Sequence, residues 1–169
     1  MKKRLIVLIV CLCLFPVFSV CENNTRVSVG RCSFFIYDDF FEVTKTLGDS
    51  LLQNLNSPMK ETSRVFMNTS ADTILIGKIA IAEPGQKLYE NEAELFVLAN
   101  DAIKGFQGES SVVTLGKAWM NHPCMTIADN KTAWNFVFFP EEIVYYYVNA
   151  NDQINLNFYQ FGFNSVIIY

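Results

Sequence analysis

Hydrophobic residues recur along the chain with two different periods, and each period predicts a different secondary structure. The segment 26–37 is rich in β-branched and aromatic residues, which predicts a first strand. After Asp38 and Asp39, apolar side chains recur every three or four positions, which predicts a helix to about Asn56. The helix is expected to end at Ser57–Pro58, because proline disfavours helical geometry in the residue before it.

The middle of the chain predicts one more strand and a second helix. Residues 73–82 are largely apolar on both faces, which is typical of a central strand, and a turn signal follows at 83–85. Segment 91–106 has the apolar spacing of a helix, although 94–99 alone would also fit a strand. We favour the helix, because the glutamates at its start suit the positive end of a helix dipole.

The rest of the chain predicts sheet, with strands over 110–119, 132–139, 143–149 and 153–163. A loop containing His122, Pro123 and Cys124 is expected after the first of them. In the last strand the apolar residues change face near Phe158 and Tyr159, which predicts a β-bulge. This order of elements predicts an α+β fold, in which one or two helices pack on a curved, mostly antiparallel sheet ending in a C-terminal meander.

The N-terminal residues 1–21 have the features of a secretory signal peptide or a membrane anchor. Three basic residues precede an apolar run over 5–20, and small residues lie at its end. As a helix this run would span roughly 24 Å, less than the ~30 Å hydrocarbon core of a membrane, so cleavage and retention both stay open. Residues 22–169 then form a single exported domain, periplasmic and either held at the inner membrane or released, with free secretion as the alternative.

Composition and charge exclude several classes of protein. The 169 residues are 51% hydrophobic and 14% aromatic, which is too apolar for a disordered chain. The net charge of −4 argues against nucleic-acid binding, which needs a dense basic surface. No second long apolar run follows the first, so the membrane is expected to be contacted only through the N-terminal segment.

The cysteines predict a disulfide within the exported domain. Cys11 and Cys13 lie inside the N-terminal apolar run and Cys21 follows it, which leaves Cys32 and Cys124 as an even pair. In an oxidising compartment such a pair is expected to form a bridge. Two separately buried thiols are the alternative.

Residues suited to catalysis are few. His122 is the only histidine, and Cys124 would be its nucleophile, but a disulfide-bonded cysteine has no thiolate to attack with. The sequence has no Gly-rich phosphate loop, no serine-hydrolase motif and too few Cys and His residues for a zinc site. Turns and helix starts explain the acidic residues that stand close together: Asp38, Asp39, Glu90, Glu92, Glu94, Glu141 and Glu142. The sequence therefore predicts no enzyme, cofactor or metal, and a small hydrolase using His122 is the least favoured alternative.

Aromatic residues are concentrated towards the C-terminus, in greater number than one core face requires. Because alternate residues of a strand share a face, Tyr145 and Tyr147 are expected on one side of their strand. We predict a surface that binds a protein partner or an apolar small ligand, formed by Trp134, Phe136, Phe138, Tyr145, Tyr147, Phe161 and Phe163. The alternative is a sheet that is covered on both sides.

The layout of the chain resembles that of ToxS-type proteins and of the similar PsaF and MyfF partners of fimbrial regulators. In these small bacterial proteins an N-terminal apolar anchor precedes a periplasmic domain that assists a membrane-bound transcription regulator. Residues 1–20 would be the anchor here, and Cys32 and Cys124 the periplasmic cysteines. The resemblance implies a non-enzymatic companion that stabilises a membrane-bound sensor in virulence regulation and completes a small β-barrel around a bile-salt-like ligand. A secreted or surface-assembled fimbrial or host-interaction module is the alternative.

Overall fold

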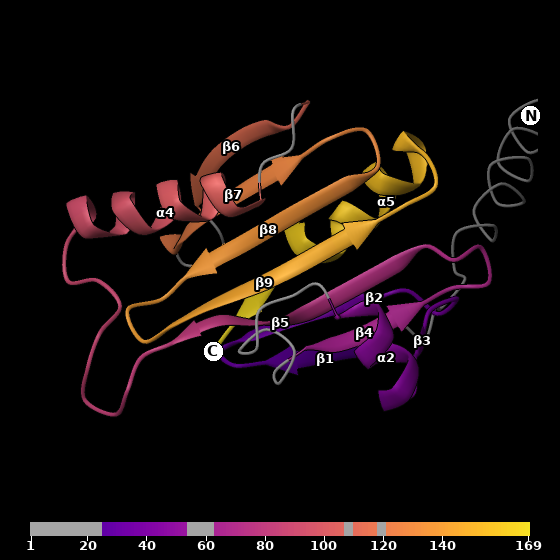
Figure 1. Cartoon of the computed structure of the whole chain (residues 1–169), viewed down its shortest axis with the longest axis horizontal. Helices are drawn as coiled ribbons and strands as arrows, with labels where there is room; N and C mark the ends of the chain where they lie inside the picture. Colours follow the sequence, from indigo (N-terminus) through magenta and orange to yellow (C-terminus); the bar gives the residue numbers. More distant parts are fainter. Residues whose placement is uncertain (1–24, 54–62, 107–109, 118–120) are drawn as a thin grey trace, which may run out of the picture.

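The computed structural model describes residues 25–53, 63–106, 110–117 and 121–169, whose arrangement is shown in Figure 1. The segment expected to be a signal or anchor lies outside these described residues. Among the described helices, none is both long and apolar enough to cross a membrane.

Seven antiparallel strands form a large sheet in the order β3-β4-β5-β9-β8-β7-β6. Strands β6 to β9 form a meander, because each pairs with the next one along the chain. β5 pairs with β4 on one side and β9 on the other, which places the two longest strands side by side. The bounds are β3 Phe41–Glu42, β4 Arg64–Met67, β5 Thr73–Ile81, β6 Val112–Lys117, β7 Pro123–Ala128, β8 Thr132–Phe138 and β9 Glu142–Asn149.

A three-stranded sheet and helix α5 cover one face of the large sheet; in Figure 1, α5 passes behind β8 and β9. Phe34, Tyr146 and Phe163 come from the small sheet, the large sheet and α5, and their ring centroids lie 5.3 to 6.4 Å apart. These contacts join the three elements in one core. The bounds are β1 Thr25–Val29, β2 Cys32–Ile36, β10 Ile167–Ile168 and α5 Gln153–Asn164.

Helices α4 (Glu92–Phe106) and α2 (Lys45–Leu51) lie on the opposite face of the large sheet. A second core lies beneath them, in which Met125, Phe136 and Tyr145 have no exposed surface. Figure 1 shows α4 over the β6–β8 end of the sheet and α2 near β4, so that the middle of the sheet lies between the two helices.

The expected fold class is confirmed, because helices pack on a mainly antiparallel sheet in an α+β arrangement. The elements predicted over 73–82, 91–106, 132–139 and 143–149 are present as β5, α4, β8 and β9. The strand predicted over 110–119 is present as β6, and residues 118–120 lie outside the described part of the chain.

The first predicted strand, 26–37, is instead the hairpin β1–β2. Gly30 has a φ of 56°, in the left-handed region that favours glycine, and the chain reverses there. A side chain at this position would also collide with Glu142, whose Cδ would lie 2.8 Å from the added Cβ. The prediction of one strand is wrong because β-rich residues flank Gly30 on both sides, and the turn depends on this single glycine.

The first predicted helix, 38–56, is reduced to α2, and residues 54–56 lie outside the described chain. Phe41–Glu42 pairs with β4 as strand β3, so Asp38 and Asp39 do not start a helix. Phe40 packs against Tyr159 of α5, with ring centroids 4.9 Å apart. Phe40 stands at helical spacing from later apolar residues, but it is not part of a helix. It belongs to the core between the large sheet, the small sheet and α5.

The last predicted strand, 153–163, is helix α5. The Asp152 carboxylate accepts a hydrogen bond of 2.8 Å from the Asn155 backbone N–H, as a helix N-cap does. Leu156, Tyr159 and Phe163 are buried at helical spacing. The change of face that the sequence analysis interpreted as a bulge is therefore the period of a helix.

Strand β7 occupies the region that was expected to be a loop around His122, Pro123 and Cys124. Pro123 is the first residue of this strand and pairs with Lys117 at the end of β6. Proline is tolerated at a strand's first residue, where no ladder hydrogen bond from its nitrogen is needed. The loop prediction gave too much weight to this proline.

Candidate functional site

The structure brings five of the seven predicted surface aromatics together on the face of the large sheet beneath α4 and α2. Strands β8 and β9 pair so that Trp134 lies opposite Tyr147 and Phe136 opposite Tyr145, and Phe138 follows on the same face. The rings of Trp134 and Tyr147 are in contact, with centroids 4.3 Å apart. Alternation along two adjacent strands was the signal that identified this set.

The other two predicted residues lie on the opposite side of the sheet. Phe163 of α5 is 6% exposed and packs in the core with Phe34. Phe161 is 58% exposed on the outer side of α5 and meets Phe35 edge to face. They do not join the Trp134 group because the segment that carries them is a helix on the other face.

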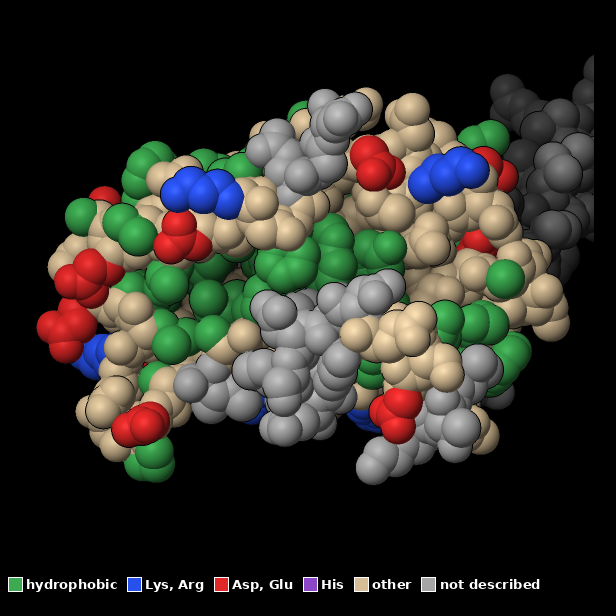
Figure 2. All heavy atoms as spheres, viewed as in Figure 1, with side chains coloured by type: hydrophobic (Ala, Val, Ile, Leu, Met, Phe, Trp, Pro, Cys, Tyr) green, Lys and Arg blue, Asp and Glu red, His purple; other side chains and the backbone are tan. Residues whose placement is uncertain are grey.

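An open hollow, here called the aromatic hollow, lies where Trp134 and Tyr147 remain half-buried. It measures about 180 Å³ and is lined by Leu51, Thr73, Leu75, Trp134, Tyr147 and Asn149. Figure 2 shows apolar side chains gathered in a depression over the middle of the sheet, below α4 in that view. Phe136 and Tyr145 have no exposed surface and act as support beneath it.

The phenol groups of this face are held in their neutral form. Burial, followed by the negative charge of Asp129, raises the pKa of Tyr147 to about 12. Burial also raises the pKa of Tyr145 to about 12, although its hydrogen bond with the Ser63 hydroxyl acts in the opposite direction. Tyr145 can reach Ser63 because Gly77, its partner on β5, has no side chain in the way: an added Cβ would lie 3.0 Å from the Tyr145 hydroxyl. The residues that line the hollow are therefore apolar or hydrogen-bonding, and none of them is charged.

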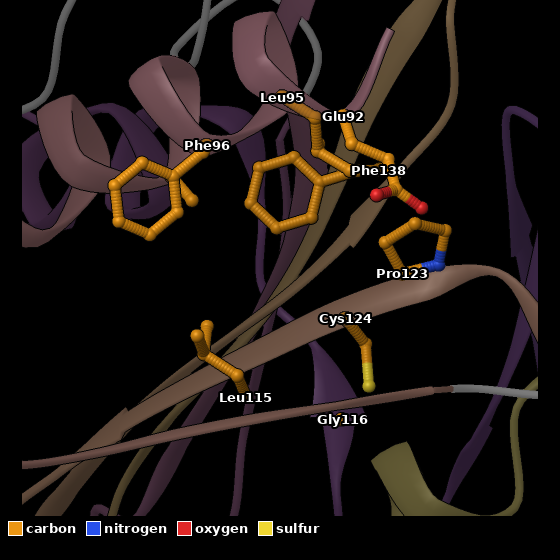
Figure 3. A pocket seen from close by; sticks show the side chains of 9 residues that line it. Glu92, Leu95, Phe96, Leu115, Gly116, Pro123, Cys124 and Phe138 are labelled. Atoms are coloured by element: carbon orange, nitrogen blue, oxygen red, sulfur yellow. The ribbon is translucent and has the colours of Figure 1, made fainter.

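A second depression, here called the edge groove, lies between α4 and strands β6 and β7. Its volume is about 220 Å³. Phe96 of α4 and Leu115 of β6 face it from opposite walls and are 61% and 60% exposed (Figure 3). The groove is lined by Glu92, Leu95, Phe96, Ala99, Leu115, Gly116, Pro123, Cys124 and Phe138. Sequence reasoning missed it because it depends on β7, which was expected to be a loop.

A larger cavity of about 530 Å³ lies between the β1–β2 hairpin and strands β3 and β4. Two of the charged groups on its wall are paired with each other, because Arg64 donates two hydrogen bonds, of 2.9 and 2.7 Å, to the Glu42 carboxylate. This pair lowers the pKa of Glu42 and raises that of Arg64, mainly through the hydrogen bonds between them. The cavity thus offers no unpaired guanidinium for an anionic ligand.

The predicted disulfide is not formed in this structure, where Cys32 and Cys124 are both free thiols. Cys32 lies on β2 of the small sheet and Cys124 on β7 of the large sheet, and both side chains pack in the core between the two sheets. Two unbridged thiols were the alternative to the disulfide.

The geometry around His122 and Cys124 does not favour nucleophilic catalysis. Burial raises the pKa of Cys124, and burial together with the nearby Glu142 raises that of Cys32 to about 12. A cysteine nucleophile requires the opposite shift, towards the thiolate. The His122 ring packs on Phe139 instead, with centroids 4.8 Å apart.

Most of the acidic residues singled out in the sequence have structural partners. Glu142 is 7% exposed; its carboxylate accepts a 2.9 Å hydrogen bond from the Arg31 N–H and pairs with Lys78 at 2.6 Å. Glu141 pairs with the Arg31 side chain at 3.2 Å. Asp39 accepts from the Asn68 amide, and Glu94 accepts from the backbone N–H of Glu90 at the start of α4. No group of three or more potential metal ligands occurs among the described residues.

Neither a protein-family model nor a curated protein matches this sequence. Among solved structures, the chain is similar to the solution structure of cyanobacterial PsbP (CyanoP) from Synechocystis sp. PCC 6803, with a TM-score of 0.53. The match covers 90% of this chain and 95% of that one at 10% sequence identity. The likeness therefore concerns the fold alone.

Proposed function

We propose that this protein is a non-enzymatic, exported protein that binds a protein partner at the aromatic hollow. The observation that carries the proposal is the pair Trp134 and Tyr147, which stay half-buried in an open apolar depression although Phe136 and Tyr145 beside them are fully buried. Tryptophan and tyrosine dominate the binding energy of many protein interfaces, because each buries a large apolar ring and keeps a polar end.

The size of the hollow favours a protein partner over a bile-salt-like molecule. Its volume of about 180 Å³ is below the roughly 300–1,000 Å³ of pockets that enclose a drug-sized ligand. One or two side chains of a partner fit this space. The neutral phenol of Tyr147 and the polar side chains of Thr73 and Asn149 can hydrogen-bond to the partner's backbone at the rim.

We further propose that the partner is a membrane-bound sensor or transcription regulator that this protein stabilises from the periplasmic side. The basic residues followed by an apolar run at the N-terminus support export to that compartment. Pro16, within a run that is short for a membrane span, supports the second candidate, a released fimbrial or host-interaction module.

Site-specific photo-cross-linking in the native host tests the proposal. A photoreactive phenylalanine replaces Trp134 in one version of the full chain and Phe161, which lies on the opposite face, in a matched control. We expect position 134 to capture a protein with a membrane-spanning segment and position 161 to capture none. Capture of a soluble surface subunit at position 134 would instead support the second candidate. Equal capture at both positions would contradict partner binding at the hollow, and hydrolysis of a substrate that is lost in His122→Ala would contradict a non-enzymatic role.

A further inference from the structure

Strand β6 is an edge of the large sheet that carries few of the usual protections against pairing. Among the described residues it pairs with β7 alone, whereas the opposite edge strand, β3, is just two residues long. Its sequence from Val112 to Lys117 has no proline and a single charge, at its end. Val112 and Leu115 are 68% and 60% exposed. Proteins usually shorten, charge or cover such edges, because unpaired backbone groups recruit another strand.

The edge groove lies beside this strand on the face that carries α4. Leu115 lies opposite Met125 in the β6–β7 ladder, and Met125 is fully buried under α4, so Leu115 shares that face. In Figure 3, Leu115 and Phe96 stand on opposite walls, with the Phe138 ring between α4 and the strands. A strand added beyond β6 would place every second side chain on this face, against Leu115 and Phe96.

The charges around the groove indicate what kind of segment fits. Glu92 lies at one end of the groove, near Pro123 (Figure 3), and no Lys or Arg of the described chain forms an ion pair with it. Nearby acids are engaged: Glu94 accepts from the Asn91 amide at 2.9 Å, and Asp101 pairs with Lys104 at 3.2 Å. Lys117 pairs with Pro123 at this end of β6 but forms no ion pair with Glu92, so an occupant with a basic side chain here would complement Glu92.

We propose that β6 takes up an extended segment of another protein as an additional strand of the large sheet, with apolar side chains in the edge groove and a basic side chain at Glu92. A second copy of this chain fits less well. In an antiparallel β6–β6 pair, Lys117 of the second copy would lie next to Val112 of this chain. Glu92 lies at the opposite end of β6, beside Pro123, which pairs with this chain's own Lys117. The second copy's Lys117 would therefore not reach Glu92. This surface lies on the other side of α4 from the aromatic hollow, and the proposal does not depend on the function proposed for that hollow.

Synthetic peptides with alternating valine and threonine provide a direct test on the full chain in mild detergent. One peptide has lysine at both ends, a second has glutamate at both ends, and a third is the lysine peptide with N-methyl groups on alternate backbone amides. Binding is measured by fluorescence anisotropy. We expect the lysine peptide to bind roughly fivefold more tightly than the glutamate peptide. The methylated peptide is expected not to bind, because its backbone cannot pair with β6.

Two variants make the test specific. Glu92→Lys is expected to reverse the order of the lysine and glutamate peptides, whereas Asp49→Lys, the same charge change on exposed α2, keeps it. Leu115→Lys is expected to weaken binding at least about tenfold, and Val112→Lys, on the opposite side of the same strand, to weaken it less. Far-ultraviolet circular dichroism checks that each variant is folded.

Three results would overturn the proposal. The first is no binding of the lysine or glutamate peptide at millimolar concentration, and the second is equal binding of the methylated and unmethylated peptides. The third is a dimer in sedimentation that Leu115→Lys dissociates, which would assign this edge to a second copy of the chain.

Discussion

The two faces of the large sheet differ in how completely they are covered. On one face, which we call the closed face, α5 and the small sheet bury Phe34, Tyr146 and Phe163. On the other, the open face, Ala99 is the buried residue of α4, and Phe96 and Val97 of the same helix are 61% and 57% exposed. The aromatic hollow and the edge groove lie on the open face, whereas the cavity of about 530 Å³ is lined by residues of the closed-face core, among them Val27, Tyr37 and Phe40. An apolar surface left uncovered beside a well-packed core is the usual mark of a binding site.

Polar side chains reinforce this contrast, because they tie the closed face together at both ends. At one end the buried Glu142 carboxylate joins the β1–β2 turn to β5 through Arg31 and Lys78. At the other end Asp72, 1% exposed, accepts hydrogen bonds from the Tyr159 hydroxyl at 3.0 Å and the Asn151 N–H at 2.8 Å. Burial, then Asp72, raises the pKa of Tyr159, so this phenol remains a donor.

The largest expected effect concerns the thiols. Cys32 has no exposed surface and its pKa is raised to about 12, so it should be alkylated only when the closed face opens. We expect native Cys32 to react more than about 10³-fold more slowly than in denaturant, because opening then costs most of the global unfolding free energy. Half-buried Cys124 should react at an intermediate rate.

Peptide mass mapping after alkylation measures both rates. Labelling in denaturant without reductant is the control for the oxidation state of the thiols. If both Cys32 and Cys124 are labelled, then they are the free thiols seen in the structure. If both stay unlabelled until a reductant is added, then they form the disulfide expected from the sequence, and the protection of Cys32 has a different cause.

The next largest effect is expected at adjacent glutamates. Glu142→Ala should lower the free energy of unfolding by about 2–3 kcal/mol, because it removes the buried carboxylate that pairs with Lys78 and accepts from the Arg31 backbone N–H. Glu141→Ala removes a pair whose side chains are 48% and 47% exposed, and should cost less than about 1 kcal/mol. Urea unfolding followed by tryptophan fluorescence compares them. Equal losses would mean that Glu142 does not secure the closed face.

Two helical glycines test directly how much room each face leaves. A Cβ at Gly162 of α5 would collide with the Tyr146 hydroxyl and lie 2.8 Å from the Phe35 carbonyl oxygen. We expect Gly162→Ala to destabilise the protein by about 2 kcal/mol. A Cβ at Gly105 of α4 meets no described atom within 4 Å, so Gly105→Ala should be neutral or stabilising by about 0.5 kcal/mol. Chemical unfolding measures both, and a costly Gly105→Ala would show that α4 packs more tightly than its exposure indicates.

The sequence predicted the open face better than the closed one, for a physical reason. Trp134, Phe136 and Tyr145 alternate on regular paired strands, so a period of two identified both the strands and their shared face. Helix α5 was mistaken for a strand because its residues include many aromatics, which have high strand propensity, and tertiary packing on Tyr146 overrides that propensity. The edge groove and the Glu142 links could not be predicted, since both depend on strands that meet only in the folded chain.

The smallest expected effect is a change of stability at high pH. In the unfolded chain a tyrosine has a pKa near 10, whereas the pKa of Tyr147 in the folded protein is about 12. The folded protein therefore keeps a proton that the unfolded chain loses between these values. This contribution to stability is fully present below pH 10 and is lost as the pH rises towards 12, by an amount on the order of 1 kcal/mol.

Urea unfolding at a series of pH values, with spectrophotometric titration of the phenols, measures this dependence. Tyr147→Phe should make the fall in stability shallower, because phenylalanine has no proton to lose, whereas Tyr169→Phe, at a position that is 75% exposed, should not. Unchanged pH dependence in Tyr147→Phe would mean that this phenol is already hydrated in the hollow. The hollow would then be a weaker apolar anchor for a partner. The difference between the two faces would also be larger than we infer, because Tyr146 on the closed face is fully buried and its pKa is raised well above the ordinary value.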